Sequence, residues 1–360
     1  MKGVFVGGST GGHVYPALAV ARESKRKGTE IYWIGKKNSL EQKLSLEEEF
    51  FFKSVPSRGF RGKRFYEKIV SFLLLCSSFI VSFRALTKIH PDFIFSCGGY
   101  TSLGPGLASF FLKIPLFIHE QNSIAGSANR LLSKMSEKTF EGFPSSFNSK
   151  TNTEYVGNPI REEINRYINE SSSIKQYSDK KYSLLILGGS QGSQELNTLV
   201  MESFEEIKEK DKLRITHQTG ESDLDKVNKF YSGTEVDFKV QAFINDIGKA
   251  YQKADLVISR AGAMTVTELI AMNKPSILIP LSWATDNHQF LNAKFMKEIG
   301  AAKIFLSNKD SSSKLASLIS ELVSDEERRL SMSNSAKLAF IPDVEKKIFK
   351  KIYESIKKKA

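Results

Sequence analysis

The chain has 360 residues, of which 41% are hydrophobic and 26% are charged, as in an ordinary soluble globular protein. This length exceeds what one hydrophobic core usually organises, so we expect two domains. The only cysteines, Cys76 and Cys97, stand in unrelated contexts, which excludes a disulfide framework and a cysteine-based zinc site.

The net charge of +12 is distributed unevenly. Residues 1–160 contain 21 Lys and Arg against 12 Asp and Glu, and residues 344–360 contain seven Lys against two Glu. An anionic membrane surface, an anionic substrate or a nucleic acid would each suit this distribution. No aromatic and basic interleaving is present, so nucleic acid is not expected as a partner.

Strands and helices alternate along the chain, which predicts parallel sheets covered by helices. In the first half, apolar runs predict strands at 3–6, 30–34, 53–55, 92–96, 116–118 and 139–140. We expect Pro16 to open the first helix and Gly28 to close it. No signal-peptide apolar region precedes the first strand, which predicts a cytoplasmic location.

The segment IVSFLLLCSSFIVSF at 69–83 is apolar on nearly every side of a helix. Fifteen residues are fewer than the roughly 20 that a spanning helix needs. One interpretation is a helix buried in the core. The other, favoured by the basic residues between 58 and 88, is a partly exposed helix that enters the headgroup region of an anionic bilayer.

The two halves meet between YVGNP at 155–159, interpreted as a last strand and a breaker, and the polar run at 169–181. A second series follows, with strands at 183–189, 213–217, 237–240, 256–259, 276–279 and 303–305, and a helix at about 193–210. A lysine-rich helix ends the chain. Each half therefore resembles one doubly wound sheet, whose ligands bind at the carboxyl ends of the strands.

Three glycine-rich turns each follow an apolar strand: GGSTGGH at 7–13, CGGYTS at 97–102 and GGSQGS at 188–193. Such turns let a backbone approach phosphate closely. None is a P-loop. A nicotinamide-dependent dehydrogenase is disfavoured because the first turn lacks G-x-G-x-x-G and lysines follow the second strand, although NADP stays open.

The segment at 254–289 predicts two strands and a helix with small residues at its start, where an anion would bind. Glu268, one turn into this helix, would suit the hydroxyls of a ribose, which indicates a nucleotide. His13, at the end of the first glycine turn, suits a general base, although it could simply cap that turn. Asp223 and Asp225 open a helix, which explains them without a metal.

In chain order, GGSTGGHVYPALAVA, CGGYTSLGPGLAS, HEQNSIAGSANR, YVGNPIR, LGGSQGS, SRAGAMTVTEL and DNHQ resemble one bacterial glycosyltransferase family. Its members add N-acetylglucosamine to undecaprenyl-pyrophosphoryl-muramoyl-pentapeptide in peptidoglycan synthesis. The resemblance covers nearly the whole chain. It implies a GT-B fold, with two Rossmann-like, doubly wound, parallel-sheet α/β domains facing across a cleft.

The same resemblance implies a lipid-acceptor and membrane-associating domain at 1–160, with the last helix at 342–360 packing back on it. Residues 161–341 would form the UDP-sugar donor domain. The implied reaction is an inverting transfer from UDP-N-acetylglucosamine to the C4 hydroxyl of the lipid-linked muramic acid. It implies no metal or other cofactor and a peripheral location on the cytoplasmic face of the inner membrane.

Carried over by motif, His13 is the candidate base, Ser190 contacts phosphate, Arg161 lies near the nucleotide and Ile244 uses its backbone at the uracil. Glu268 holds the ribose, and Gln289 reaches the sugar hydroxyls, with His288 as an alternative. The implied binding residues are Thr10, Gly11, Gly12, Asn122, Arg161, Ser190, Ile244, Ala263, Met264, Thr265, Val266, Thr267, Glu268 and Gln289.

Overall fold

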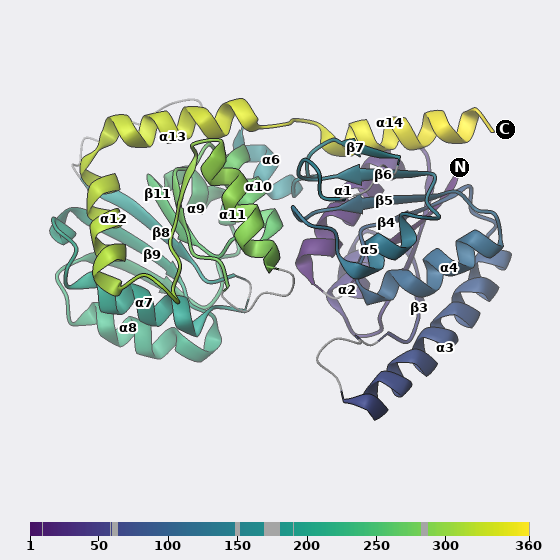
Figure 1. The fold of residues 1–360 in the computed structure, drawn as a ribbon, viewed down its shortest axis with the longest axis horizontal. Coiled ribbons are helices and arrows are strands. Elements are labelled where there is room, and N and C mark those ends of the chain that lie inside the picture. The colour runs from purple at the N-terminus through teal and green to yellow at the C-terminus, as the bar shows by residue number, and fades with distance from the viewer. Residues whose placement is uncertain are drawn as a thin grey trace. The chain divides into compact units, whose positions relative to one another are not determined.

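The structure is a computed structural model that describes residues 1–8, 10–57, 59, 64–147, 152–168, 181–189, 191–281 and 287–359. The chain forms two compact units (Figure 1). The N-terminal unit comprises Met1–Arg161 with Ile341–Ala360, and the C-terminal unit is Glu162–Phe340. Arg161, which the sequence assigned to the donor domain, therefore belongs to the N-terminal unit.

The N-terminal unit is built on a seven-stranded sheet whose neighbouring strands are all parallel. Its strands are β1 (Lys2–Val6), β2 (Glu30–Gly35), β3 (Phe51–Ser54), β4 (Phe93–Ser96), β5 (Leu116–Glu120), β6 (Lys138–Glu141) and β7 (Thr153–Tyr155). The spatial order is β3-β2-β1-β4-β5-β6-β7. Strands are thus added outward in one direction from β1 to β3 and in the other direction from β4 to β7, and we call the point between β1 and β4 the change of direction of the sheet. Ligands of such sheets bind at the carboxyl ends of the two strands beside this point.

The C-terminal unit repeats this topology with six parallel strands in the order β10-β9-β8-β11-β12-β13. The strands are β8 (Tyr182–Leu187), β9 (Leu213–Gln218), β10 (Asp237–Gln241), β11 (Leu256–Ser259), β12 (Ser276–Leu278) and β13 (Ala302–Ile304). The corresponding change of direction lies between β8 and β11. The described part of the chain thus has the two doubly wound parallel sheets that the sequence predicted.

Helices cover both sheets (Figure 1). In the N-terminal unit these are α1 (Gly11–Arg26), α2 (Leu40–Glu47), α3 (Phe65–Ile89), α4 (Leu103–Phe111), α5 (Ser127–Leu132) and α14 (Val344–Lys357). In the C-terminal unit these are α6 (Glu162–Ile168), α7 (Gln194–Phe204), α8 (Leu224–Ser232), α9 (Ile247–Lys253), α10 (Ala263–Ala271), α11 (His288–Glu298), α12 (Ser312–Ser324) and α13 (Glu326–Ala339). Short 3-10 turns stand at Tyr100–Ser102, Lys210–Lys212 and Glu221–Asp223.

Several predicted boundaries differ from the structure. Pro16 lies inside α1, which already begins at Gly11, because the glycine turn itself enters the helix. The last strand and breaker predicted at 155–159 are present, but the strand, β7, begins at Thr153 and ends at Tyr155, and Gly157 then takes a positive φ of 87° that a strand does not accept. The helix predicted to reach residue 210 ends at Phe204.

The last helix, α14, packs on α1 in the N-terminal unit. Its side chains Val344, Ile348 and Ile352 are buried in the same apolar cluster as Val14 and Leu18 of α1. Its lysines are exposed, except Lys351, which is half-buried and pairs with Glu154. This amphipathic division explains how a strongly basic segment contributes to a hydrophobic core.

Helix α3 is longer than the sequence indicated and has an unusual distribution of side chains. It has 25 residues, and within the described chain Tyr66–Ile89 is long and apolar enough to cross a membrane by length and composition. Between Tyr66 and Phe83, the buried positions of α3 are the serines Ser71, Ser78 and Ser82, whereas bulky apolar side chains such as Phe72 and Leu73 are exposed.

We define the apolar face as the exposed side chains Tyr66, Ile69, Val70, Phe72, Leu73 and Ile80 of α3 with Phe110 and Phe111 of α4. The two helices lie side by side, and the first turns of α3 extend away from the sheet (Figure 1). Small residues allow this close approach, since a Cβ at Gly104 of α4 would come within 2.3 Å of the Ser78 hydroxyl. The expectation that α3 could be entirely a core helix is therefore wrong.

The first two glycine turns meet at the change of direction in the N-terminal sheet. Gly99 has a φ of 84°, and a Cβ there would lie 2.6 Å from the carbonyl oxygen of Gly8. Only glycine satisfies both conditions, because the positive φ disfavours a side chain and the neighbouring backbone leaves no room for one.

We predict that Gly99→Ala destabilises the N-terminal unit more than Gly28→Ala. Gly28 has a similar φ of 81°, but a Cβ added there would have nothing within 4 Å, so Gly28→Ala isolates the backbone cost of about 1–2 kcal/mol. Gly99→Ala should cost about 1–3 kcal/mol more because the turn must move. Thermal and urea unfolding of both variants measure the difference, and equal losses would contradict the packing argument.

Candidate active site

The first glycine turn leads directly into α1. Thr10 is the N-cap in an extended conformation without a side-chain cap hydrogen bond, and the first turn of the helix contains no acid. The amides of Gly11 and Gly12 come first in the helix, so they have no intrahelical acceptor. Together with the helix dipole, they form a positive main-chain end suited to an anion or a polar hydroxyl group.

His13 stands in this first turn and contacts two other segments. Its Nδ1 lies 2.9 Å from the carbonyl oxygen of Cys97 and 3.0 Å from Oε1 of Gln121. A Cβ at Gly99 would lie 3.7 Å from its Cδ2. The structure therefore brings His13 together with the second glycine turn and the HEQNS loop, which lie 84 and 108 residues further along the chain at Cys97 and Gln121.

The HEQNS loop is held by Glu120, which is 1% exposed. Its carboxylate accepts hydrogen bonds from the backbone N–H groups of Asn122 and Gly126, both at 2.9 Å, and from the Asn129 side chain at 2.9 Å. Asn122 also donates its side-chain amide to Glu120. Glu120 is thus an internally bonded organiser of the loop, and Asn122 is partly buried beside it.

In the C-terminal unit, the third glycine turn connects β8 to α7. Gly189 and Gly192 have φ values of 94° and 78°. Gln218, at the end of β9, donates its amide to the Gly189 carbonyl at 2.7 Å and accepts from the Ile244 N–H at 2.9 Å. Gln218 therefore links the third glycine turn to Ile244, the residue predicted to contact the uracil. Ser190, the predicted phosphate contact, lies outside the described residues.

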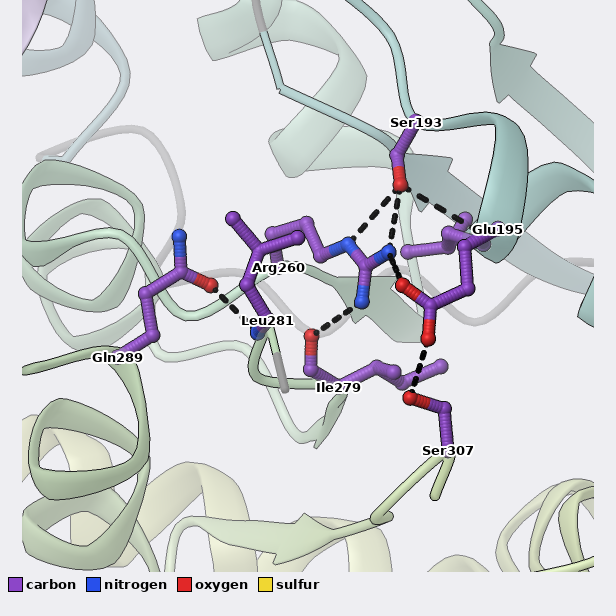
Figure 2. A network of polar contacts seen from close by, with 8 residues as sticks. Ser193, Glu195, Arg260, Ile279, Leu281, Gln289 and Ser307 are labelled. Atoms are coloured by element: carbon purple, nitrogen blue, oxygen red, sulfur yellow. Dashed lines mark hydrogen bonds and ion pairs between the residues drawn. The ribbon is translucent and has the colours of Figure 1, made fainter. Parts of the chain in front are cut away.

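Arg260 ties this turn to the β11–α10 connection (Figure 2). Its guanidinium donates to the Ser193 hydroxyl at 3.0 and 2.7 Å, to Glu195 at 2.8 Å and to the Ile279 carbonyl at 3.2 Å. Glu195 in turn accepts from Ser307 at 2.5 Å. Arg260 is 5% exposed, so this paired charge fixes the shape of the turn from beneath and is not itself presented to a ligand.

Helix α10 begins at the same change of direction in the sheet. Its N-cap, Gly262, provides no side-chain cap, and the first turn contains no acid. Ala263 and Val266 are buried, and Met264, Thr265 and Thr267 are half-buried. Val266 is 0% exposed and its N–H bonds to Gly262, so it supports the helix end from the core. This is a second main-chain end suited to an anion.

Glu268 is 2% exposed and accepts a hydrogen bond from the Tyr251 hydroxyl at 3.2 Å. It lies on the second turn of α10, on the buried side. Tyr251 of α9 was not foreseen from the sequence, because nothing in the sequence shows that α9 and α10 lie together.

Gln289, in the first turn of α11, is 9% exposed and accepts from the Leu281 N–H at 3.0 Å (Figure 2). Asn292 donates to the Ala261 carbonyl at 3.1 Å, which holds α11 against the start of α10. His288 follows the αL residue Asn287 and directly precedes Gln289. The intervening residues 282–286 lie outside the described chain.

Two predicted residues contact other protein groups. The Ile244 N–H donates to Oε1 of Gln218 at 2.9 Å. Arg161 lies over the ring of Tyr15, with 4.9 Å between its guanidinium carbon and the ring centroid. Arg161 is therefore anchored on α1 of the N-terminal unit.

Among the residues that the structure describes, no group of three His, Cys, Asp or Glu side chains could hold a metal ion. Four residues of the site were not predicted from the sequence, and all of them hydrogen-bond to other protein groups. They are Gln121, Gln218, Arg260 and Tyr251. Position at a strand end was the signal available for Gln218 and Arg260.

Comparison with known proteins agrees with this architecture. The glycosyltransferase family 28 N-terminal domain matches residues 4–141, and the family 28 C-terminal domain matches residues 183–348. The crystal structure of Acinetobacter baumannii MurG is similar with a TM-score of 0.82 and 29% identity, covering 98% of this chain and 99% of that one. The fold is that of a GT-B glycosyltransferase.

Two curated relatives define the family more narrowly. A protein of Coxiella burnetii is 35% identical over 97% of this chain and 98% of its own length, and one of Colwellia psychrerythraea is 36% identical over 95% and 90%. Both are named UDP-N-acetylglucosamine--N-acetylmuramyl-(pentapeptide) pyrophosphoryl-undecaprenol N-acetylglucosamine transferase. The chain belongs to this family of transferases. It is therefore not a nicotinamide-dependent dehydrogenase, the alternative that the sequence left open.

We predict that Arg260→Met lowers the stability of the C-terminal unit by about 2–4 kcal/mol. The loss should be less than for a fully buried pair because the Glu195 side chain is 30% exposed. Urea unfolding of Arg260→Met, Glu195→Gln and the double variant gives the coupling energy, which should be about 1–2 kcal/mol. Strictly additive losses would show that the pair does not act as a unit.

Proposed function

We propose that this chain transfers N-acetylglucosamine from UDP-N-acetylglucosamine to the C4 hydroxyl of undecaprenyl-pyrophosphoryl-muramoyl-pentapeptide, with inversion at the anomeric carbon. The observation that carries the proposal is the pair of uncapped, acid-free helix starts, α1 and α10, at the changes of direction of the two sheets. His13 accompanies the first and Glu268 the second.

The C-terminal unit binds the donor in this proposal. The diphosphate lies at the start of α10 and the third glycine turn, where main-chain amides at Ala263 and Met264 neutralise it. Glu268 accepts from the ribose hydroxyls while Tyr251 fixes its orientation. The uracil contacts the Ile244 carbonyl, and Gln289 reaches the sugar hydroxyls with the amide nitrogen that its bond to Leu281 leaves.

The N-terminal unit binds the acceptor. Thr10, Gly11 and Gly12 present the start of α1, and Asn122 presents its side-chain amide from the loop that Glu120 holds. His13 removes the proton from the C4 hydroxyl as the oxygen forms its bond to the anomeric carbon. The bond from that carbon to the diphosphate breaks at the same time, so UDP leaves and the product is β-linked.

Stabilisation of the leaving diphosphate comes from preorganised main-chain donors. Removal of one such donor in other enzymes costs about 2.7–4 kcal/mol, so two or three amides supply a substantial part of the barrier reduction. Arg260 contributes indirectly because it keeps Ser193 and the third glycine turn in place.

The apolar face of α3 and α4 docks on the bilayer that carries the lipid acceptor. Phe72 and Leu73 are 57% and 61% exposed, and Phe111 is 65% exposed. Lys68 and Arg84, both exposed on α3, suit anionic headgroups. The second half of α3 is anchored by core residues such as Leu86, so α3 lies in the interface and does not span the membrane. The enzyme is then peripheral on the cytoplasmic face of the inner membrane.

We expect His13→Ala to lower turnover by about 10²–10⁴-fold while leaving UDP binding unchanged, because a general base acts on the chemical step. Transfer of radiolabelled sugar from UDP-N-acetylglucosamine to a polyprenyl-linked muramoyl-pentapeptide is the assay.

In the same assay, Glu268→Gln should raise KM for the donor more than it lowers kcat. Donor binding without any product in the unmodified protein would instead favour a nucleotide-sensing scaffold.

We expect the double substitution Phe72→Ser and Leu73→Ser to reduce flotation with liposomes that contain anionic lipid. Leu338→Ser is the matched control, because Leu338 is 89% exposed and lies on α13 of the other unit. Flotation of the unmodified protein should fall as anionic lipid is removed. If the double variant floats as well as the control, the apolar face is not the docking surface.

A further inference from the structure

The base proposed above is connected to a chain of buried groups that its catalytic role does not explain. His13 contacts Gln121, Gln121 contacts His119, and His119 contacts the backbone at Gly157. Gln121 and His119 are 1% and 0% exposed. We infer that Gln121 is a positioning residue that, with the Cys97 carbonyl, holds His13 as the Nδ1–H tautomer and leaves Nε2 as the proton-accepting atom. This inference rests on the proposed function.

The orientation of the Gln121 amide follows from its neighbours. Its Nε2 lies 3.0 Å from the carbonyl oxygen of His119, which can only accept a hydrogen bond. The nitrogen must therefore point toward His119, and the oxygen toward His13. The backbone at this position is also fixed, because Asn158 donates to the Gln121 carbonyl at 3.0 Å.

His119 supports the same orientation. Its Nε2 lies 2.9 Å from the Gly157 carbonyl oxygen and so carries the proton. Burial lowers the pKa of His119 to about 4, which keeps the ring neutral at physiological pH. Nδ1 of His119 is then an acceptor, and it takes the second amide proton of Gln121 at 3.1 Å.

The tautomer of His13 is determined by what faces its Nδ1. The Cys97 carbonyl at 2.9 Å and Gln121 Oε1 at 3.0 Å are both acceptors. Nδ1 must carry the proton to bond either of them, so a neutral ring keeps its lone pair on Nε2. Both hydrogen bonds that the ring makes within the described chain fall on Nδ1.

An amide suits this position because it orients the ring without pairing it with a charge. The same two acceptors stay satisfied when Nε2 takes up a proton, so neither protonation state requires rearrangement. Other titratable groups beside the chain of contacts are the Cys97 thiol, whose pKa burial raises, and the Glu120 carboxylate, which interacts with both Cys97 and His119. Glu120 is occupied by the Asn122 loop.

Nitrogen-15 NMR of ring-labelled histidine tests the inference directly. The chain has five histidines, and the His13 signals are assigned from a His13→Gln sample. At pH 8 His13 of the unmodified protein should be the Nδ1–H tautomer, with a pyridine-type Nε2. An Nε2–H tautomer would overturn the inference, and this measurement requires no variant of Gln121 to fold.

Two variants then test the role of Gln121. Gln121→Met removes one of the two acceptors at His13 Nδ1 and leaves the Cys97 carbonyl as the other, so the share of the Nδ1–H tautomer should fall. The variant should also lower kcat about 10–100-fold, with little change in KM for UDP-N-acetylglucosamine. His217, whose ring lies in the other unit, is the internal reference in the spectra, and Asn228→Met is the surface control for activity. Unchanged kcat or an unchanged His13 tautomer in Gln121→Met would overturn the positioning role.

Gln121→Glu retains an acceptor toward His13 but adds a carboxylate. It should keep the Nδ1–H tautomer and move the acidic limb of the kcat/KM profile upward by about one pH unit, because a nearby negative charge raises the pKa of an imidazole. A shift of the acidic limb to lower pH would contradict the assignment. If the tautomers behave as stated but His13→Ala retains full turnover, the tautomer assignment stands and the proposed base is wrong.

Discussion

The structure depends on one topological constraint. In each parallel sheet, the direction in which strands are added reverses beside the first strand. Because all strands run the same way, the turns after β1 and β4 lie next to one another, as do those after β8 and β11. The backbones of Gly8 and Gly99 are then too close for any side chain. The glycines at positions 8 and 99 are a consequence of this packing, and a helix start with room for a ligand is its result.

In each unit, a buried charged side chain forms hydrogen bonds that hold a loop or turn of the candidate site in place. Glu120 organises the loop of Asn122, and Arg260 organises the turn that contains Ser193. Both are almost completely buried and paired, so their electrostatic energy is used to fix geometry and not to bind a ligand directly. The amide of Gln121 does the same for His13 without any charge.

Helix α3 shows how a packed domain can present an apolar surface. Its small serines face the protein and allow close packing against Gly104 of α4, whereas its large side chains remain outside. This reverses the usual amphipathic pattern for a surface helix. The exposed apolar area has a stabilising environment only in lipid or against another apolar surface.

Sequence alone determined the two parallel-sheet domains, the glycine turns and the family, because unbroken apolar runs and turn residues are local signals. It did not determine the length of α3, the start of α1 before Pro16, or the partners of His13. Those depend on contacts between segments far apart in the chain, such as His13 with Cys97 and Gln121. A hydrogen-bond partner, and with it the tautomer of a histidine, is decided only when the folded chain places donors and acceptors together.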